Sequence, residues 1–264
     1  KFFDISLVKS VEKHKALELK LKNSNPSRDF VLHYQPRIDA GSGDLIGAEV
    51  FPRLKDDDSY TAADILPIAE EVGFMARLGN WIIEAALAQE KAWKDNFGKD
   101  ISMSINLSPL QLLDSEFLNN LKHITTAYGI DPGMIRLDIS NDAIMGASIT
   151  AKETLRALHD YGYKLSLNDF GGYDINLSHI LTCGFSAIDI SPSLIRRSDT
   201  EEDANILIRT IIGLADNLKI DAYAVGIESK EQAEKLKSMG VKSLQGYYFG
   251  RPVEAAEFEK TYIK

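Results

Sequence analysis

The feature of this sequence that most constrains its fold is the alternation, after Pro26, of short apolar segments with amphipathic helical patterns. The strand-like segments lie at 31–34, 45–48, 101–107, 135–139, 164–167, 187–190, 222–227 and 241–244. Helical patterns separate many of them, the clearest from 62 onward and at 78–96, 149–161, 202–218, 230–239 and 255–262. The glycine-rich turn at 41–44 predicts a hairpin between the first two strands, and the later units predict parallel strands with helical crossovers. About eight strands in roughly 240 residues predict an α/β fold, a TIM-like (β/α)8 barrel.

The segment before Pro26 has a different character. Residues 7–22 carry scattered leucines among many lysines and glutamates, and Asn23-Ser24-Asn25-Pro26 ends this helical pattern. A lone charged helix has little surface to bury. We therefore expect residues 1–25 to form an exposed connector helix, the tail of a preceding domain, and residues 26–264 to form the barrel. The alternative is a helix that packs on the barrel.

Composition removes several classes of protein from consideration. The chain has 264 residues, 44% of them hydrophobic and 26% charged, which is the balance of a globular protein that buries a core. Cys183 is the single cysteine, so no internal disulfide can form and a reducing, cytoplasmic location is expected. No segment has the roughly 20 apolar residues of a membrane span, so no membrane contact is expected. The five histidines lack zinc-ligand spacing, and no GxGxxG motif follows a strand.

The net charge is -9, which argues against duplex nucleic acid as a partner. An anionic ligand is not excluded, because a few arginines or a bound metal can reverse the field locally.

Polar residues recur where the predicted strands end. The set is Glu49, Asn106, Asp138 with Asn141, Asn168 with Asp169, Asp189 and Gln245, and each follows an apolar run. In (β/α)8 barrels the carboxyl ends of the strands carry the chemistry, because the loops there meet around one mouth. Oxygen ligands of this kind suit hard divalent cations, and two such ions can act on a phosphoryl centre. A single member can equally be a turn residue or a helix cap, but the recurrence favours a ligand site.

Several motifs resemble those of the EAL domain family, bacterial barrels that hydrolyse the second messenger cyclic di-GMP or, in degenerate members, bind it or a protein partner. They are Tyr34-Gln35-Pro36, Gly47-Ala48-Glu49-Val50-Phe51, Ser104-Ile105-Asn106-Leu107-Ser108 and Gln245-Gly246-Tyr247-Tyr248-Phe249-Gly250-Arg251-Pro252. The similarity runs over nearly the whole chain from Phe30, although the signature triplet reads Glu-Val-Phe where Glu-Ala-Leu is usual. Phe2-Phe3-Asp4 and the helix after it resemble the tail of a GGDEF domain and its linker.

The resemblance implies a metal site, from which this chain departs. The positions matching the family's metal ligands are Glu49, Asn106, Asp138 and Asp169, which would hold Mg²⁺, Mn²⁺ or Ca²⁺. Asp138 is one methylene shorter than the family's glutamate, and Asn168 replaces the first of two adjacent aspartates. Asp189 replaces a lysine that serves the attacking water, and Val225 replaces an acid. Loss of a general base costs about 10²–10⁴-fold in rate, so we expect weak or absent metal binding and no effective hydrolysis.

The resemblance also implies a ligand groove that binding without catalysis could retain. Its residues would be Gln35, Glu49, Phe51, Arg53, Gln245, Tyr247, Arg251 and Pro252. Arg53 stands where the family's arginine reaches a phosphate of the dinucleotide, a role that suits a guanidinium. Pro52 precedes it, removes a backbone donor and is expected to move the arginine. The alternative is that Arg53 and Arg251 make ordinary ion pairs at the surface. The motifs that begin at Tyr34 and Gln245 would then persist because they pack the barrel.

The acids Glu49, Asp138, Asp169 and Asp189 are expected to face one another with no lysine between them. Either a cation binds there, or one acid is protonated, or a dianionic ligand is repelled. Three functions stay open. The one we favour is a catalytically inactive receptor for cyclic di-GMP or a regulatory domain. The others are a protein-interaction module without ligand and a slow metal-dependent phosphodiesterase.

The expected macromolecular partners follow from the same resemblance. Relatives often pair through the loop and helix after the Asp-Asp position, so a homodimer is one expectation. The altered residues at 172–176 weaken this expectation. Asn141 stands in place of the glutamate that anchors this loop in the family, which is a further change to the catalytic machinery. An attached GGDEF domain or another protein is the other expected partner.

Overall fold

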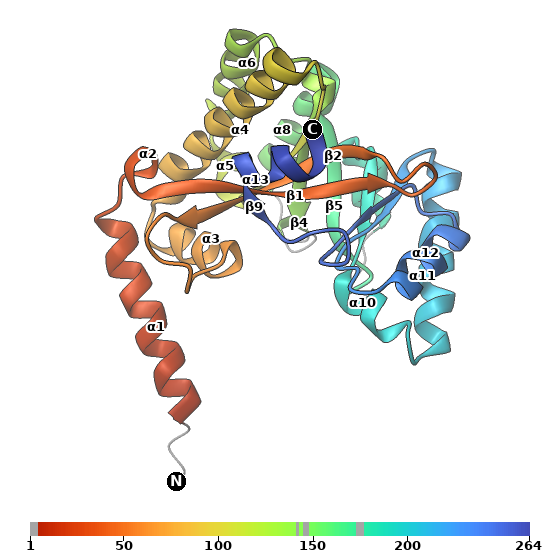
Figure 1. Ribbon diagram of the computed structural model, residues 1–264. Coiled ribbons are helices and arrows are strands. Elements are labelled where there is room, and N and C mark those ends of the chain that lie inside the picture. The colour runs from red at the N-terminus through yellow and green to blue at the C-terminus, as the bar shows by residue number, and fades with distance from the viewer. Residues whose placement is uncertain (1–4, 141–142, 145–147, 173–176) are drawn as a thin grey trace.

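A computed structural model of the chain describes residues 5–140, 143–144, 148–172 and 177–264. At its centre the strands follow one another in the order β2-β3-β4-β5-β6-β7-β8-β1, and β1 pairs again with β2, so the sheet closes on itself. A short strand, β9 (Val253–Glu254), is added beside β1. Helices cover the outside of the sheet (Figure 1). The predicted TIM-like (β/α)8 barrel is confirmed.

The hairpin predicted at the start of the barrel is present, and both of its strands are longer than expected. β1 (Phe30–Asp39) and β2 (Leu45–Leu54) pair in antiparallel fashion. β1 also pairs antiparallel with β8, so it runs against the other strands of the barrel. This closure brings Gln35 opposite Glu49 and Arg37 opposite Gln245. Residues from both ends of the chain therefore meet inside one ring.

The remaining strands of the barrel are short and parallel. They are β3 (Ser102–Leu107), β4 (Ile135–Ser140), β5 (Lys164–Phe170), β6 (Ala187–Ile190), β7 (Asp221–Ala224) and β8 (Ser243–Gln245). The sequence predicted each of them, with ends that differ by a few residues. β7 shows the largest difference, because the segment after Ala224 leaves the sheet at Gly226, which takes a left-handed conformation with φ of 81°.

Helices lie between the strands, and those predicted from 62 onward and at 78–96, 149–161, 202–218 and 230–239 are present, whereas α6 (Phe117–Tyr128) was not among the predicted helices. The long ones are α3 (Ala62–Glu71), α4 (Met75–Phe97), α6 (Phe117–Tyr128), α8 (Ile149–Tyr161), α11 (Glu202–Leu218) and α12 (Lys230–Met239). Shorter ones are α2 (Pro26–Asp29), α5 (Pro109–Leu113), η1 (Pro132–Met134), α9 (Leu177–Cys183), α10 (Pro192–Arg197), α13 (Ala255–Phe258) and η2 (Glu259–Ile263). Ser229 and Gln232 form a capping box at the start of α12, and Gly240 ends it in a left-handed conformation.

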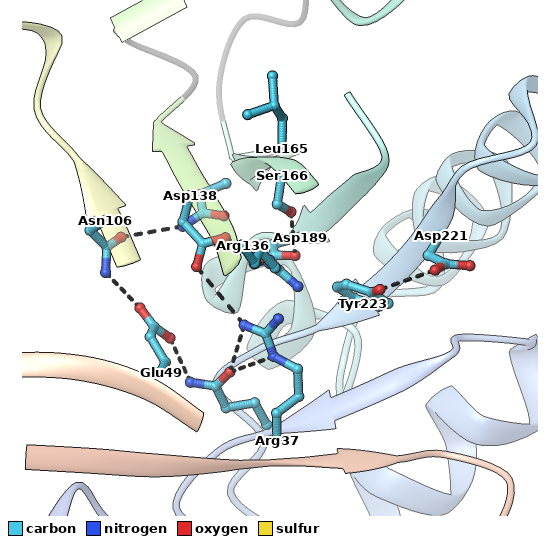
Figure 2. A network of polar contacts seen from close by, with 12 residues as sticks. Arg37, Glu49, Asn106, Arg136, Asp138, Leu165, Ser166, Asp189, Asp221 and Tyr223 are labelled. Carbon is cyan, nitrogen blue, oxygen red and sulfur yellow. Dashed lines mark hydrogen bonds and ion pairs between the residues drawn. The ribbon is translucent and has the colours of Figure 1, made fainter. Parts of the chain in front are cut away.

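Strand residues alternate between two environments, as the pleat of a strand requires. On β4, Leu137 and Ile139 are fully buried on the face that the helices cover. Arg136 and Asp138 alternate with them and point into the barrel, where they are also buried (Figure 2). The apolar core therefore lies between the sheet and its helices, while the inside of the barrel is polar.

Helix α1 (Ile5–Lys22) packs against α3 over its second half, and its first half extends away from the barrel (Figure 1). Leu17 and Leu21 are fully buried, whereas Leu19 between them is 64% exposed. Lys13 reinforces the contact by pairing with Asp64 of α3 at 2.9 Å. The expectation of an exposed helix is therefore wrong for the second half of α1.

Three expectations fall outside the described residues. They concern Phe2-Phe3-Asp4, Asn141 and residues 173–176 of the loop linked to a homodimer. Within the part of the chain that the structure covers, every helix is too short or too polar to cross a membrane.

Candidate functional site

A cavity of about 650 Å³ opens at the carboxyl ends of the barrel strands, and we call it the carboxyl-end cavity. It brings together the sequence-predicted residues Gln35, Glu49, Asn106, Asn168, Asp169, Asp189, Val225, Gln245 and Tyr247. They come from seven different strands and the loops after them, so only a closed barrel can gather them. The prediction that polar strand ends converge at one mouth is confirmed in its geometry.

The carboxylate of Glu49 is held between two amide side chains. Asn106 Nδ2 donates to Glu49 Oε1 at 2.7 Å, and Gln245 Nε2 donates to Glu49 Oε2 at 2.6 Å. The network continues on both sides, because Asn168 donates to Asn106 at 3.5 Å and Gln245 also donates to Gln35 at 3.0 Å. Both oxygens of Glu49 are therefore occupied by protein donors.

Asp169 stands at the end of β5 in a backbone conformation that few residues adopt. Its φ is 58°, in the left-handed region where Asp and Asn are among the better tolerated residues besides glycine. Ser191 Oγ donates to Asp169 Oδ1 at 2.5 Å and so ties this strand end to the start of α10. The carboxylate of Asp169 is accordingly directed toward β6, which Ser191 follows.

Beneath the cavity, Arg136 joins two buried carboxylates (Figure 2). Its Nε donates to Asp138 Oδ1 at 2.6 Å, and its Nη2 donates to Asp189 Oδ2. Ser166 Oγ donates to the other oxygen of Asp189 at 3.0 Å. All four side chains come from strands β4, β5 and β6 and are almost entirely buried. Asp189 therefore faces a cation that the protein itself supplies.

A second buried guanidinium, that of Arg37, reaches the same group from β1. Its Nη2 lies 3.9 Å from Asp138 Oδ2, and its Nε and Nη2 donate to Gln245 Oε1 at 3.4 Å. The ring of Tyr223 lies against both arginines, 5.5 Å from the Cζ atom of Arg37 and 4.6 Å from that of Arg136. Two cations and two carboxylates thus share the interior of the barrel.

Sequence reasoning missed both arginines, although a signal for them exists. Arg37 lies two residues after Gln35, and Arg136 lies two residues before Asp138. Residues at that spacing on a strand share one face, so an arginine beside each predicted site residue must also point into the barrel. The expectation of facing acids without a compensating cation is therefore corrected, since arginines rather than a lysine offset them.

Burial and charge shift the pKa values of this group. Burial raises the pKa of Asp138 to about 7, with Arg136 opposing the rise and Asp189 adding to it. Burial lowers the pKa of Arg37, and repulsion by Arg136 adds to the effect. Although burial also acts on Arg136, attraction to the two aspartates dominates and raises its pKa. Arg136 is therefore the fixed charge around which the acids are arranged.

The residues present do not form a ready metal site. In the described residues no three histidine, cysteine, aspartate or glutamate side chains stand where they could hold one metal ion together. Of the predicted ligands, Glu49 is bound by amides, Asp138 by Arg136 and Asp169 by Ser191. Among the described residues of the group, the buried oxygens without a hydrogen-bond partner are Asp138 Oδ2 and Asn168 Oδ1, too few for a centre of two ions. The buried acids Asp138 and Asp189 are therefore arranged around the guanidinium of Arg136 and not around a metal ion.

Some predicted ligand-binding residues do not line the carboxyl-end cavity. These are Phe51, Arg53, Arg251 and Pro252, and Asp138 lies below its floor. Arg53 is half-buried and donates to the backbone oxygen of Tyr60 at 3.5 Å. The guanidinium of Arg251 lies 4.2 Å from the ring centroid of Tyr247, which is 54% exposed at the rim. Arg251 therefore acts on the cavity through Tyr247.

The cavity also contains a cation that the sequence did not single out. Arg196 on α10 lines it, is exposed, and makes no ion pair with any residue in the described part of the chain. Glu228 also lines the cavity and carries the opposite charge. A free guanidinium at the rim of a half-polar cavity is suited to a phosphate or carboxylate oxygen.

Comparisons with known proteins agree with this architecture. The chain is 30% identical to the oxygen sensor protein DosP of Escherichia coli over 97% of its own length and 32% of that protein. It is 27% identical to the bifunctional diguanylate cyclase/cyclic di-GMP phosphodiesterase MucR of Pseudomonas aeruginosa, over 97% of its length and 38% of that protein. It thus spans about a third of these relatives.

A solved structure extends the likeness to three dimensions. The EAL enzyme Bd1971, in its cAMP- and cyclic-di-GMP-bound form, superposes with a TM-score of 0.89 at 26% sequence identity, covering 97% of this chain and 70% of that one. The family model described as EAL domain matches residues 18–252, which is most of the chain. The chain therefore belongs to the EAL domain family.

Proposed function

We propose that this barrel is a receptor for cyclic di-GMP that does not hydrolyse it. The observation that carries the proposal is the pairing of Arg136 with both Asp138 and Asp189 beneath the cavity. In this arrangement the protein itself neutralises Asp138, a predicted metal ligand, and Asp189, which replaces the family's lysine, while the cavity above them stays open. The structure of Bd1971 in its cAMP- and cyclic-di-GMP-bound form supports the ligand class.

The case against hydrolysis rests on what each side chain is already doing. A metal-bound hydroxide needs acids free to bind the ion and lower the pKa of its water. Here Glu49 accepts two hydrogen bonds from amides, and Asp138 accepts one from a guanidinium. A cation would have to displace these donors before it could bind. The matching lysine of the family is also absent, because Asp189 stands there.

The case for binding rests on the cavity. Its volume of about 650 Å³ lies within the usual range for small-ligand sites. Amide groups of Gln35, Asn168 and Gln245 line it and can exchange hydrogen bonds with a guanine edge or a ribose hydroxyl. Arg196 offers its guanidinium to one phosphate of the dinucleotide. Tyr247 offers an exposed ring on which a base can stack.

The role of the domain in a larger protein follows from the same reasoning. MucR joins two cyclic di-GMP activities in one protein, and this chain matches only part of it. We propose that residues 1–25 connect the barrel to another signalling domain, such as a GGDEF domain, and that the barrel regulates it when the ligand binds.

Titration calorimetry tests the proposal directly. Cyclic di-GMP is titrated into the protein once with EDTA and once with Mg²⁺, and the same sample is then assayed for linear dinucleotide. We expect binding in both buffers, with dissociation constants that agree within about twofold, and no product. Absence of heat at high micromolar concentration would instead identify a protein-interaction module. Linear product that is lost in Glu49→Ala would identify a slow phosphodiesterase.

A further inference from the structure

A second cavity, of about 530 Å³, opens at the opposite end of the barrel. We call it the amino-end cavity because its walls come from the first residues of the strands, among them Ser102 of β3, Lys164 of β5 and Asp221 of β7. The two cavities therefore lie at the two ends of one barrel. The function proposed above does not use this second cavity.

The cavity exists because the bottom layer of the barrel is filled by small and polar residues. Barrels of this class usually fill such layers with bulky branched side chains. Here β2 contributes Gly47, and a Cβ atom at that position would lie 2.8 Å from the backbone oxygen of Ser102. Ser102 is itself small. The close approach of these two strands thus excludes a side chain and leaves the end of the barrel open.

The lining of the cavity is basic, although the chain as a whole has a net charge of -9. Arg37, Lys164 and Lys219 contribute positive charges, and Asp221 contributes the single negative one among the lining residues. One oxygen of Asp221 already has a partner, because the hydroxyl of Tyr223 donates a hydrogen bond to Asp221 Oδ2 at 3.0 Å (Figure 2). Neither lysine makes an ion pair or a side-chain hydrogen bond with another residue in the described ranges.

Arg37 is the buried member of this basic group. It is only 5% exposed, yet its contacts are poor: both hydrogen bonds to Gln245 are 3.4 Å long, and Asp138 lies 3.9 Å away. A guanidinium has five N–H donors, and its Nη1 has no partner within the described part of the chain. A buried and incompletely satisfied arginine that lines a cavity favours an anionic occupant.

Apolar side chains form the other part of the wall. Phe185, Ile220 and Tyr223 line the cavity together with the basic group. The volume exceeds what a bare inorganic anion fills and falls in the range of small organic ligands. The chemistry of the wall therefore matches a molecule that joins a doubly charged anion to a flat or apolar body.

We propose that the amino-end cavity is a second binding site, for a small phosphate monoester. Its phosphate lies among Arg37, Lys164 and Lys219, and its organic part lies against Phe185 and Ile220. Arg37 also links this site to the first, since it donates to Gln245, which lines the carboxyl-end cavity. An occupant that draws Arg37 away from Gln245 changes the hydrogen bonding of Glu49, and the two sites are then coupled in both directions.

Phenyl phosphate is a suitable probe, because it joins a dianion to an aromatic ring. Calorimetry is performed with phenyl phosphate, and with inorganic phosphate alone, at matched ionic strength. We expect saturable binding of phenyl phosphate that is tighter than that of inorganic phosphate. The double variant Lys164→Ala/Lys219→Ala is expected to weaken it at least about tenfold, since two charge-assisted contacts are lost.

Two control variants assign the site. Lys230→Ala removes an exposed lysine of α12 outside this cavity, and Arg196→Ala removes the arginine that lines the carboxyl-end cavity. Both are expected to bind phenyl phosphate like the unaltered protein. Absence of binding, or equal weakening in Lys230→Ala, would overturn the proposal. Selective weakening in Arg196→Ala would place the probe in the carboxyl-end cavity and overturn it as well, whereas cyclic di-GMP titrations test the first site separately.

Discussion

The Nε atom of Arg136 lies 2.6 Å from Oδ1 of Asp138, two positions further along the same strand. Residues at this spacing point to the same face of a strand, so an arginine inside a barrel meets the carboxylate beside it without any special loop. In this barrel the same guanidinium also reaches Asp189 across β5. Arg136, a residue of the barrel sheet, thereby offsets the negative charge of two carboxylates at the floor of the ligand cavity.

Replacing Arg136 by Met tests this role. The substitution keeps most of the side-chain volume and leaves Asp189 without its cationic partner in a buried position. Breaking a buried pair in this way costs about 3–5 kcal/mol, which we expect as a loss in the free energy of unfolding measured with urea. Arg209→Ala is the control, because it breaks an exposed pair with Glu202, which is expected to contribute less than about 1 kcal/mol. Similar small losses in both variants would contradict the assignment.

The stability of the protein should depend on pH through Asp138. Its pKa is raised from 3.8 to about 7 in the folded protein, so between about pH 4 and pH 7 the folded state holds a proton that the unfolded chain has released. The contribution of this group to stability is therefore full below about pH 4 and is lost as the pH rises to about 7. We expect the free energy of unfolding, measured with urea, to be lower at pH 7.5 than at pH 5, and we expect the variant Asp138→Asn to lack this decrease. If the variant shows the same decrease as the unaltered protein, the pH dependence belongs to other groups.

Helix α1 offers a matched pair of substitutions. Leu21 is fully buried, whereas Leu19 on the same helix is 64% exposed. We expect Leu21→Ala to lower the free energy of unfolding by about 2–5 kcal/mol, because it leaves a cavity under the helix. Leu19→Ala should change it by less than about 0.5 kcal/mol. Thermal and urea denaturation measure both, and equal effects would show that the second half of α1 does not pack on α3 in solution.

Two neighbouring arginines on α10 test the proposed ligand contact. Arg196 lines the carboxyl-end cavity, while Arg197 pairs with Glu201 at 2.7 Å outside it. We expect Arg196→Ala to weaken cyclic di-GMP binding about tenfold or more, since a charge-assisted hydrogen bond to phosphate is lost. Arg197→Ala should bind as the unaltered protein does. Calorimetry measures the affinity of both variants for cyclic di-GMP. Equal affinities would show that Arg196 does not contact the ligand.

The barrel and the position of its mouth were predictable from the sequence because both depend on local patterns. Apolar runs that end in Asn or Asp mark the strands, and parallel strands bring these ends together. Asn106, Asn168 and Asp169 were placed correctly on this basis. The hairpin was equally visible from its glycine-rich turn.

The ion cluster was not predictable by the same means. Arg37 meets Gln245 only because β1 closes the ring against β8, which joins residues 208 positions apart in the chain. A strand arginine is normally taken to face solvent, since burial of a charge is costly without a partner. The partner here is supplied by tertiary structure. For Arg53 the position in the motif suggested a ligand contact, but its guanidinium lies against Tyr60 instead.

Helix α3 separates the ligand cavity from the N-terminal helix by the width of one helix. Its residue Ala63 lines the carboxyl-end cavity and also a smaller hollow of about 250 Å³ between α1 and α3. A ligand in the carboxyl-end cavity would therefore lie against α3 on the side opposite to the packed half of α1. Because the second half of α1 packs on α3 and its first half projects from the barrel, a rotation of α3 by a given angle would displace the start of α1 further than it displaces Leu17 or Leu21.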